Sequence, residues 1–279
     1  TKPKNFSDLV RIAGLSHGTD VWLSNAQTLI AEGKATLSSC ICTRDDIMIY
    51  LIQMGVENET AFQIMEKVRR GKGLTPEMEA TMRENGVQDW YIESCKKIQY
   101  MFPKAHAIAY VTMAIRIAYF KVYYPLAYYA AYFSIRAKGF DYEKMCLGRG
   151  KLHTHMEEYA KLEKPTNSEQ DTIDTMYIVD EMYARGYTFM PIDLYKAKAT
   201  RFQVIDDQIM PSFTSLDGMG EKVAEMLEAE AAKGPFNSQA NLKSRAKVPS
   251  KSVEKMVDLG IIKDLPLSDQ ISLEDIFLK

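Results

Sequence analysis

Apolar residues recur at helical spacing along most of the chain, and clusters of glycine, proline and hydroxyl residues divide the pattern into short segments. The first segment, 6–36, begins with Ser7 as a candidate N-cap and is interrupted at 15–20. Further helices are predicted at 45–55, 59–68, 76–85, 88–100, 107–124, 142–162 and 172–185. This pattern predicts a mainly α fold.

One predicted helix, 107–124, carries apolar residues around nearly its whole circumference. A helix that is apolar on all sides is usually buried, so we expect this one to lie in the core. Lys104 and His106 stand at its N-terminal end. Free N–H groups and the partial positive charge of a helix start favour a phosphate there.

The last third of the chain changes character. Short strands are predicted at 191–193, 201–205 and 208–210, with Asp206 and Asp207 in a turn, so a small mixed segment follows the helices. This part ends in two similar helix entries, 211–224 and 248–260.

The two helix entries have the form of a tandem helix-hairpin-helix module. The first entry carries two glycines that aim backbone N–H groups outward, and the second repeats the shape with serine and more lysine. Such a pair grips both strands of a duplex through phosphates rather than bases. The alternative is a helical turn that only packs. The candidate DNA-binding residues are Gly218, Gly220, Lys222, Ser250 and Lys251.

Charge is unevenly distributed. The chain carries a net charge of −2, but the stretch 94–140 has seven Lys and Arg, no Asp or Glu, and twelve Tyr or Phe, which leaves −9 elsewhere. Cations interleaved with aromatic rings suit phosphates and stacked bases. An amphipathic core helix is the alternative interpretation of the same stretch.

Three further polar features are candidates for ligand contact. Arg44 stands at a helix start, where a guanidinium is unfavourable unless it holds an anion. Arg69, Arg70 and Lys72 lie in a glycine-containing loop that can approach a phosphate, although basic loops are common. His17 lies in the polar loop 15–20, which is either a ligand-facing loop or an ordinary helix connection.

Composition excludes several classes of protein. Hydrophobic content of 46% and charged content of 26% fit a soluble globular protein. The apolar run 105–120 is too short and too charged to predict a membrane span. The four cysteines lack CxxC spacing, so we expect neither a zinc knuckle nor a disulfide framework, and a reducing cytoplasm is the default. No signal peptide is predicted, and the opening on threonine suggests a piece of something longer.

Five segments resemble one family in order along the chain. They are LVRIAGLSHGTDVW, RDDIMIYLIQMG, KVRRGKGLT, DWYIESCKKIQYMFPKAHAIAY and RIAYFKVYYPLAYYAAYF. They resemble the fingers region of PolC-type replicative DNA polymerases, the C-family alpha subunits of low-GC Gram-positive bacteria. The related DnaE type is disfavoured by MFPKAHA and SHGTDVW. The resemblance implies a fingers region at 1–205 (core 1–140, extension 141–205), a duplex-binding module at 206–265 and a tail at 266–279.

The resemblance also implies roles for the candidate residues. Three residues would approach the triphosphate of an incoming dNTP, and two aromatic residues would frame the nascent base pair. The polar loop and the basic loop would lie near the nucleotide or the template. The residues near the triphosphate would be Arg44, Lys104 and His106, and those that frame the base pair would be Tyr100 and Phe102. The loop residues would be His17, Arg69, Arg70 and Lys72. Implied partners are the dNTP, primer-template duplex DNA, and the palm and remaining polymerase domains.

Two departures from the family pattern bear on function. The family ends in a clamp-binding sequence like QLSLF, but here Glu274 stands where Phe is expected, so sliding-clamp binding would rest on Gln270, Leu273 and Phe277. The palm, whose aspartates hold Mg²⁺, is not recognisable in this chain.

We therefore expect neither catalytic residues nor a metal site in this chain. Asp45-Asp46 and Asp206-Asp207 are interpreted as helix-start and turn acids. The prediction is a region of a cytoplasmic bacterial DNA-directed DNA polymerase that is inactive alone. The alternative is a stand-alone helix-hairpin-helix protein that binds duplex DNA without nucleotide chemistry.

Overall fold

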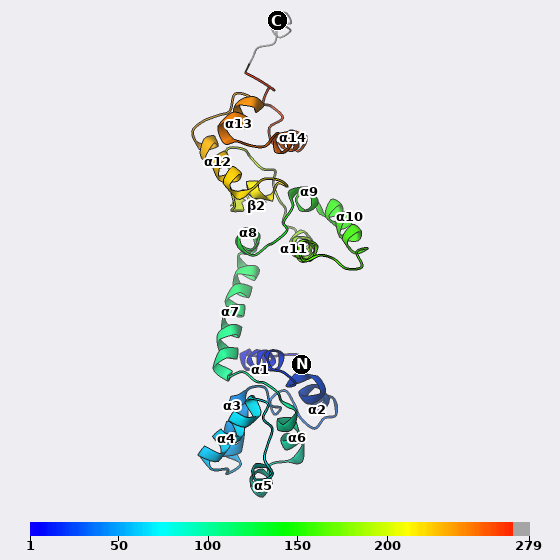
Figure 1. Cartoon of the computed structure of the whole chain (residues 1–279), viewed down its shortest axis with the longest axis vertical. Helices are drawn as coiled ribbons and strands as arrows, with labels where there is room; N and C mark the ends of the chain where they lie inside the picture. The colour runs from blue at the N-terminus through cyan, green and yellow to red at the C-terminus, as the bar shows by residue number, and fades with distance from the viewer. Residues whose placement is uncertain (270–279) are drawn as a thin grey trace, which may run out of the picture. The chain divides into compact units, whose positions relative to one another are not determined.

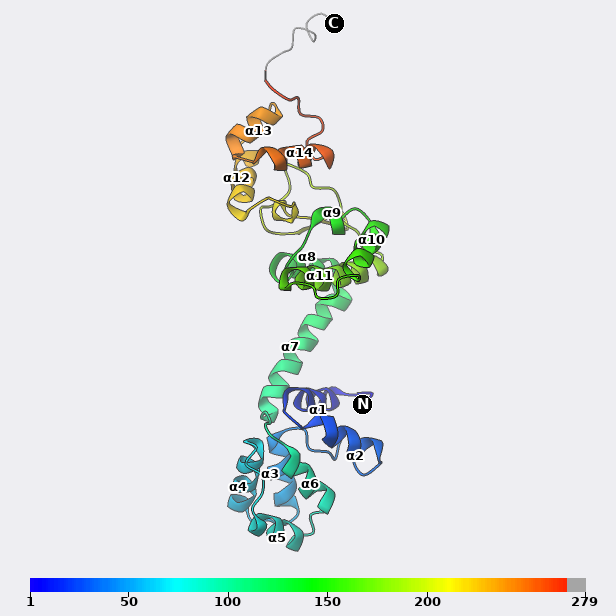
Figure 2. The ribbon, with the colours of Figure 1, turned by 45° about the vertical axis from the view of Figure 1, so that its right-hand side comes forward.

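The computed structural model describes residues 1–269 (Figures 1 and 2). It divides into two compact units, Thr1–Ala118 and a second that begins at Tyr119. The fold is mainly helical, as predicted, and the described residues contain one small two-stranded sheet.

The first unit is built from helices alone. In chain order they are α1 (Phe6–His17), η1 (Trp22–Ala26), α2 (Gln27–Ala31), α3 (Arg44–Gln53), α4 (Asn58–Arg69), α5 (Pro76–Glu84) and α6 (Asp89–Lys97), followed by the start of α7 (Lys104–Tyr123). Figure 1 shows α3 and α4 side by side, and they form the most extensive helix pair of this unit. Buried residues of α3, α4 and α6, such as Ile47, Ile64 and Ile92, form its core.

Capping explains where several helices begin. The Asn5 side chain, not Ser7, caps α1 by accepting a hydrogen bond from the Asp8 amide at 2.9 Å. Thr43 is the N-cap position of α3, as predicted, and its own amide donates to the Asp46 carboxylate at 2.9 Å. Thr75 caps α5, with proline in the first turn. These side chains satisfy amides that lack helical partners.

Helix α7 is not the buried core helix that its sequence predicts. Only Ala107 and Val111 are buried, and they pack against Val10 of α1. Apolar side chains on the rest of α7 are exposed, including Met113 at 54%. An apolar circumference predicts burial only if other elements surround the helix, and in this unit α1 covers one face. No described helix is long and apolar enough to cross a membrane.

The helices of the second unit surround an aromatic core. They are α8 (Pro125–Ile135), α9 (Tyr142–Met145), α10 (Arg149–Tyr159) and α11 (Asn167–Ala184). The predicted helix 142–162 is broken between α9 and α10 at Gly148, whose φ of +101° favours glycine. Tyr129 and Phe133 of α8 pack with Phe202 and other buried side chains in the core.

A short hairpin follows these helices. β1 (Gln203–Ile205) pairs antiparallel with β2 (Gln208–Met210), with Val204 opposite Ile209 and a turn at 206–207 as predicted. The predicted strand at 191–193 does not form. Pro191 has no N–H to donate, and the Asp193 carboxylate accepts from the Tyr195 amide at 2.9 Å, which starts a turn instead.

The end of the described chain is again helical. It contains η2 (Phe213–Ser215), α12 (Glu221–Ala232), α13 (Gln239–Ala246) and α14 (Ser250–Asp258). Buried side chains from all four, including Phe213, Leu227, Leu242 and Met256, share one core. The predicted helix entries therefore fold into one packed body.

Candidate functional site

Four of the predicted nucleotide-contacting residues form one aromatic cluster in the first unit. The His106 ring stacks on Phe102 with centroids 4.8 Å apart, and Tyr100 meets Phe102 edge-on at 5.1 Å. His17, at the end of α1, lies 5.9 Å from Phe102 and 6.2 Å from His106. The fold thus brings His17 together with residues at least 83 positions later in the chain, and 44% of Tyr100 remains exposed.

Sequence reasoning missed one member of this cluster. Tyr110 lies 4.5 Å from the His106 ring and 5.6 Å from the His17 ring. Residues four apart on a helix share a face, so the spacing from His106 to Tyr110 was a usable signal. Tyr110 is 57% exposed and enlarges the open aromatic surface.

Backbone hydrogen bonds hold the segment before α7 in place. The Thr19 amide donates to the Tyr100 carbonyl at 2.9 Å, which clips the polar loop to this segment. The Arg44 amide donates to the Phe102 carbonyl at 3.2 Å, and the Met101 amide donates to the Arg69 carbonyl at 3.3 Å. The aromatic side chains are therefore anchored to the start of α3 and the end of α4.

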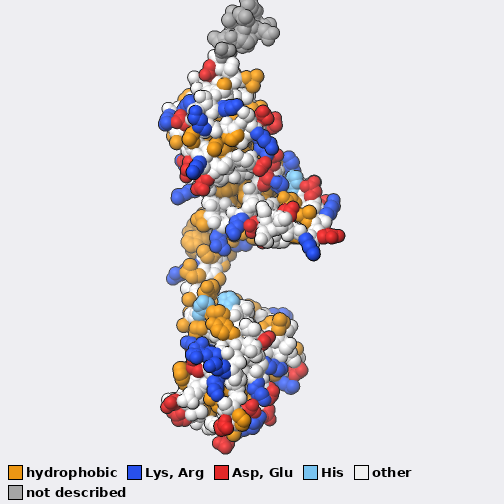
Figure 3. Space-filling model, in the orientation of Figure 1, with side chains coloured by type: hydrophobic (Ala, Val, Ile, Leu, Met, Phe, Trp, Pro, Cys, Tyr) orange, Lys and Arg blue, Asp and Glu red, His pale blue; other side chains and the backbone are white. Residues whose placement is uncertain are grey.

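Three arginines converge beside that segment on one carboxylate. Arg69 makes a bidentate pair with Glu66 of α4, with its Nη2 2.8 Å from Oε2. Arg70 Nη2 lies 2.8 Å from Oε2 of Glu66, and Arg44 Nη1 lies 3.8 Å from Oε1. We refer to Arg44, Glu66, Arg69 and Arg70 as the arginine cluster. Figure 3 shows Lys and Arg side chains gathered on this unit below its histidines, with hydrophobic side chains between the two groups.

Electrostatics fixes the protonation of the cluster. Hydrogen bonds from Arg69, and then the charges of Arg69, Arg70 and Arg44, hold the pKa of Glu66 below its ordinary value. The same hydrogen bonds raise the pKa of Arg69. Glu66 is therefore an anion near neutral pH and the cluster carries a net charge of +2. The Arg44 guanidinium thus has a carboxylate partner within the chain, 3.8 Å away, and its contact with a nucleotide stays a prediction.

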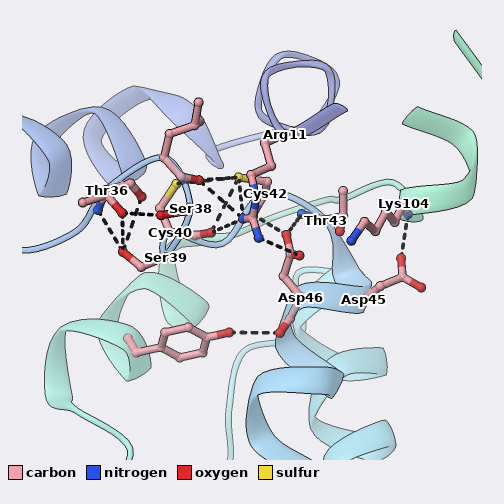
Figure 4. A network of polar contacts seen from close by, with 12 residues as sticks. Arg11, Thr36, Ser38, Ser39, Cys40, Cys42, Thr43, Asp45, Asp46 and Lys104 are labelled. Carbon is pink, nitrogen blue, oxygen red and sulfur yellow. Dashed lines mark hydrogen bonds and ion pairs between the residues drawn. The ribbon is translucent and has the colours of Figure 1, made fainter. Parts of the chain in front are cut away.

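Lys104 lies in different surroundings from His106. Its backbone amide, the first of α7, donates to the Asp45 carboxylate at 2.6 Å (Figure 4), so this amide is not free for a phosphate. The Asp45 carboxylate therefore accepts a hydrogen bond from the start of α7, whereas the Asp46 carboxylate accepts one from the start of α3. The Lys104 side chain lines a pocket of about 490 Å³ together with Arg11 and Trp90.

A polar network braces the loop that leads into α3 (Figure 4). Arg11 donates to the Leu37 and Cys40 carbonyls at 3.4 Å and lies 3.8 Å from the Asp46 carboxylate. The free, buried thiols of Cys40 and Cys42 are 3.6 Å apart, and the Arg11 guanidinium contacts the second. This network orients the first turn of α3, which carries Arg44.

Close packing requires glycine at the first glycine position of the basic loop after α4. Gly71 has a φ of +68°, and a Cβ there would lie 2.5 Å from the Gln99 carbonyl oxygen. The glycine allows the loop to pass close to the segment before α7. The loop that carries Arg70 and Lys72 therefore lies against Gln99, the residue before Tyr100.

The two hairpin turns of the second unit lie next to each other. Gly218 has a φ of +79°, and a Cβ there would be 3.6 Å from the Ser252 hydroxyl. Gly220 is the N-cap position of α12. Lys255 of α14 lies 3.2 Å from Asp217 and 2.6 Å from Glu143 of α9, which ties the first turn to α14 and to the rest of the unit.

The predicted DNA-contacting side chains of this unit differ in their availability. Lys222 and Lys251 are exposed, and neither forms an ion pair with a described residue. The Ser250 hydroxyl already accepts a hydrogen bond from Lys243, a lysine that sequence reasoning missed. Glu221 adds a negative charge at the first position of α12. A phosphate at this surface would therefore meet lysines and first-turn amides more readily than Ser250.

Comparison with known proteins identifies the family. Residues 1–89 match the family "Bacterial DNA polymerase III alpha subunit finger domain", and residues 186–270 match "Helix-hairpin-helix motif". A DNA polymerase III PolC-type from Clostridium perfringens is 50% identical over 274 residues, covering 98% of this chain and 19% of that protein. The chain is homologous to a region of PolC-type DNA polymerase III.

Other PolC-type polymerases match to the same extent. The protein from Streptococcus thermophilus is 49% identical over 99% of this chain, and that from Staphylococcus saprophyticus is 48% identical over 99%. The chain spans about a fifth of the length of these relatives. The predicted resemblance to the C-terminal part of PolC is confirmed.

The finger-domain match covers only part of the site in this PolC region. It includes His17 and the arginine cluster but ends before the segment that carries Tyr100, Phe102 and His106. The predicted clamp-binding residues Gln270, Leu273 and Phe277 lie outside the described residues. Within residues 1–269, no group of three or more His, Cys, Asp or Glu side chains could hold a metal ion.

Proposed function

We propose that this PolC region binds an incoming dNTP with its first unit and grips primer-template duplex with its second. One observation carries the nucleotide part: the arginine cluster and the aromatic cluster are joined through the backbone of one segment. The Arg44 amide bonds the Phe102 carbonyl, and the Arg69 carbonyl accepts from the Met101 amide. Backbone hydrogen bonds thus hold the segments that carry the guanidinium groups against the segment that carries the rings.

The chemistry of these groups fits a nucleoside triphosphate. Guanidinium groups bind phosphate oxygens through paired N–H donors, and exposed rings stack on bases for roughly 1–3 kcal/mol per base. The exposed ring of Tyr100 is available for stacking, while Arg44 and Arg70 retain N–H groups beyond those that meet Glu66. The site would bind and orient the nucleotide.

The chemical step would take place elsewhere in the complete polymerase. Mg²⁺ would be held by palm carboxylates outside this chain, where metal ions activate the primer hydroxyl and stabilise the leaving pyrophosphate. The residues described here would position the triphosphate and offset its charge, an effect worth roughly 2–4 kcal/mol at such sites. We therefore expect this chain alone to lack polymerase activity.

The exposed face of α7 supports contact with the remaining polymerase domains. Tyr110, Met113 and Ile117 are each at least half exposed, and neighbouring exposed apolar side chains on one helix are typical of a surface that another part of a protein covers. Because the chain spans about a fifth of its relatives, other parts of such a polymerase are available to cover this face.

The duplex grip would act through the backbone of DNA. First-turn amides of α12 and α14, together with Lys222, Lys251 and Lys243, can meet phosphates on both strands. Binding should be insensitive to base sequence, and log K should fall with log salt by about 0.9 per phosphate neutralised. A strong sequence preference would contradict this grip.

Substitutions separate nucleotide binding from duplex binding. We expect Arg44→Ala and Arg70→Ala each to weaken dGTP binding by about tenfold, since a charged hydrogen bond contributes about 1.5–3 kcal/mol. Affinity for a 20-base-pair duplex should not change. Arg83→Ala, which removes an ion-paired arginine on α5, is the matched control. If both substitutions leave dGTP binding intact, the chain is a duplex-binding module without a nucleotide site.

A further inference from the structure

Glu66 lies at the centre of the arginine cluster, and the proposed function gives it no role. Glu66 lies on α4, about two turns from the helix start and one turn before Arg69, the last residue of the helix. It contacts Arg44 of α3, Arg69 of its own helix and Arg70 of the following loop. Its side chain is only 20% exposed. One carboxylate therefore joins guanidinium groups from three segments.

The contacts are unequal, which divides the arginines into two kinds. Arg69 uses both Nε and Nη2 on Glu66, so its planar fork is engaged. Arg70 uses a single nitrogen, and Arg44 lies 3.8 Å away, beyond hydrogen-bond distance. Arg44 and Arg70 thus keep most of their donors for another acceptor while remaining beside the carboxylate.

Removing the carboxylate would alter both charge and position. Three guanidinium groups without Glu66 would carry +3 in place of +2 and would repel one another. Long arginine side chains without a shared partner also regain the rotamer freedom that an ordered site must exclude. Displacement of a binding group by about 1 Å can reduce function by a factor on the order of 100.

We propose that Glu66 is a positioning residue, which holds Arg44 and Arg70 together as hydrogen-bond donors to the polyphosphate of a nucleotide. This inference rests on the proposed nucleotide-binding function and adds a specificity for triphosphates over monophosphates. Arg69 fixes the carboxylate, the carboxylate orients the other two guanidinium groups, and these contact successive phosphates.

The opposite interpretation gives an effect of opposite sign. If Glu66 only contributed a negative charge near a phosphate, neutralising it would tighten dGTP binding. If Glu66 positions the arginines, neutralising it loosens dGTP binding despite the gain of positive charge. Glu66→Gln therefore distinguishes the two roles by the direction of the change alone.

The test is equilibrium binding to the full 279-residue chain. We expect Glu66→Gln to raise the Kd for dGTP and for inorganic tripolyphosphate by about tenfold and to raise the Kd for dGMP by less than about threefold, because a single phosphate meets fewer of the guanidinium groups. Glu66→Asp should lie between, because the charge stays but the shorter side chain reaches less far. Glu59→Gln, an exposed carboxylate of the same helix, is the matched control.

Several results would overturn the inference. Tighter or unchanged dGTP binding in Glu66→Gln would contradict it, as would an equal loss for dGTP and dGMP. If Glu66→Gln lowers the Tm of the first unit, the test relies on Glu66→Asp instead. A dGTP affinity of Glu66→Asp equal to that of the wild type would then contradict the inference. If the wild-type chain binds dGMP and dGTP equally well, only this inference fails. If it binds neither, the proposed function fails.

Discussion

At the scale of residues, the arginine cluster explains why an arginine can begin a helix. Arg44 stands at the unfavourable end of the α3 dipole, but Glu66 lies within 3.8 Å and Asp46 caps the same helix end. The position of Arg44 at a helix start indicated that its guanidinium favours a nearby anion. It did not show which anion, because Glu66 and Arg44 belong to different helices and only folding brings them together.

The pH dependence of stability follows from the lowered pKa of Glu66. Because the pKa is lower in the folded chain, this carboxylate stabilises the fold above its ordinary pKa of 4.5. That contribution is lost as the pH falls below 4.5 toward the folded pKa. We expect the difference in Tm between wild type and Glu66→Gln to shrink from pH 6 to pH 3. A difference that is constant over this range would contradict the assignment.

The cap of α3 gives a second prediction at this scale. Asp46 accepts hydrogen bonds from the amides of Cys42 and Thr43 and lies near Arg11. We expect Asp46→Ala to lower the free energy of unfolding by about 1–2 kcal/mol, the usual cost of losing such capping bonds. Denaturant titration measures this cost. Glu84→Ala on α5 is the control, with a change of less than about 0.5 kcal/mol expected for an exposed side chain that makes no hydrogen bond or ion pair with a described residue.

At the scale of elements, helix existence was predictable and helix burial was not. The capping residues Thr43 and Thr75 marked the starts of α3 and α5, since cap chemistry is local. The apolar circumference of α7 indicated burial, but burial depends on which neighbours exist. Tyr110 and Met113 of α7 are exposed because only α1 packs on this helix within the first unit.

Substitutions on α7 and in the core should therefore lower the free energy of unfolding by different amounts. We expect Met113→Ala to change the free energy of unfolding by less than about 0.5 kcal/mol, because the side chain is half exposed. Ile92→Ala on α6 should cost about 2–5 kcal/mol, because the side chain is fully buried. Chemical denaturation of the two variants measures both values. Equal costs would show that the α7 face is packed in solution.

At the scale of the whole molecule, motif order allowed the family to be recognised before any geometry was known. The segments carrying His17, Arg44, Arg70 and Lys104 occur in the order of a PolC region, and the comparisons confirm that relationship. The aromatic cluster was less accessible to sequence reasoning. Its members come from α1, from the segment before α7 and from α7 itself, and the Thr19–Tyr100 backbone bonds that join them have no sequence signature.

The absence of a recognisable palm leads to a prediction for activity. We expect the 279-residue chain, supplied with Mg²⁺, four dNTPs and a primed template, to add no nucleotide to the primer. The reason is that the described residues contain no group of three or more His, Cys, Asp or Glu side chains that could hold the catalytic metal ions. Gel analysis of a labelled primer measures extension. Processive extension by the chain alone would contradict the account.

Hydrogen exchange measured by mass spectrometry tests the central claim most directly, because it locates both ligands on one chain. The account predicts that dGTP slows exchange in 66–72 and 99–106, whereas duplex DNA slows exchange in 216–222 and 247–252. Slowed exchange in 99–106 that appears with duplex alone and never with dGTP would contradict it.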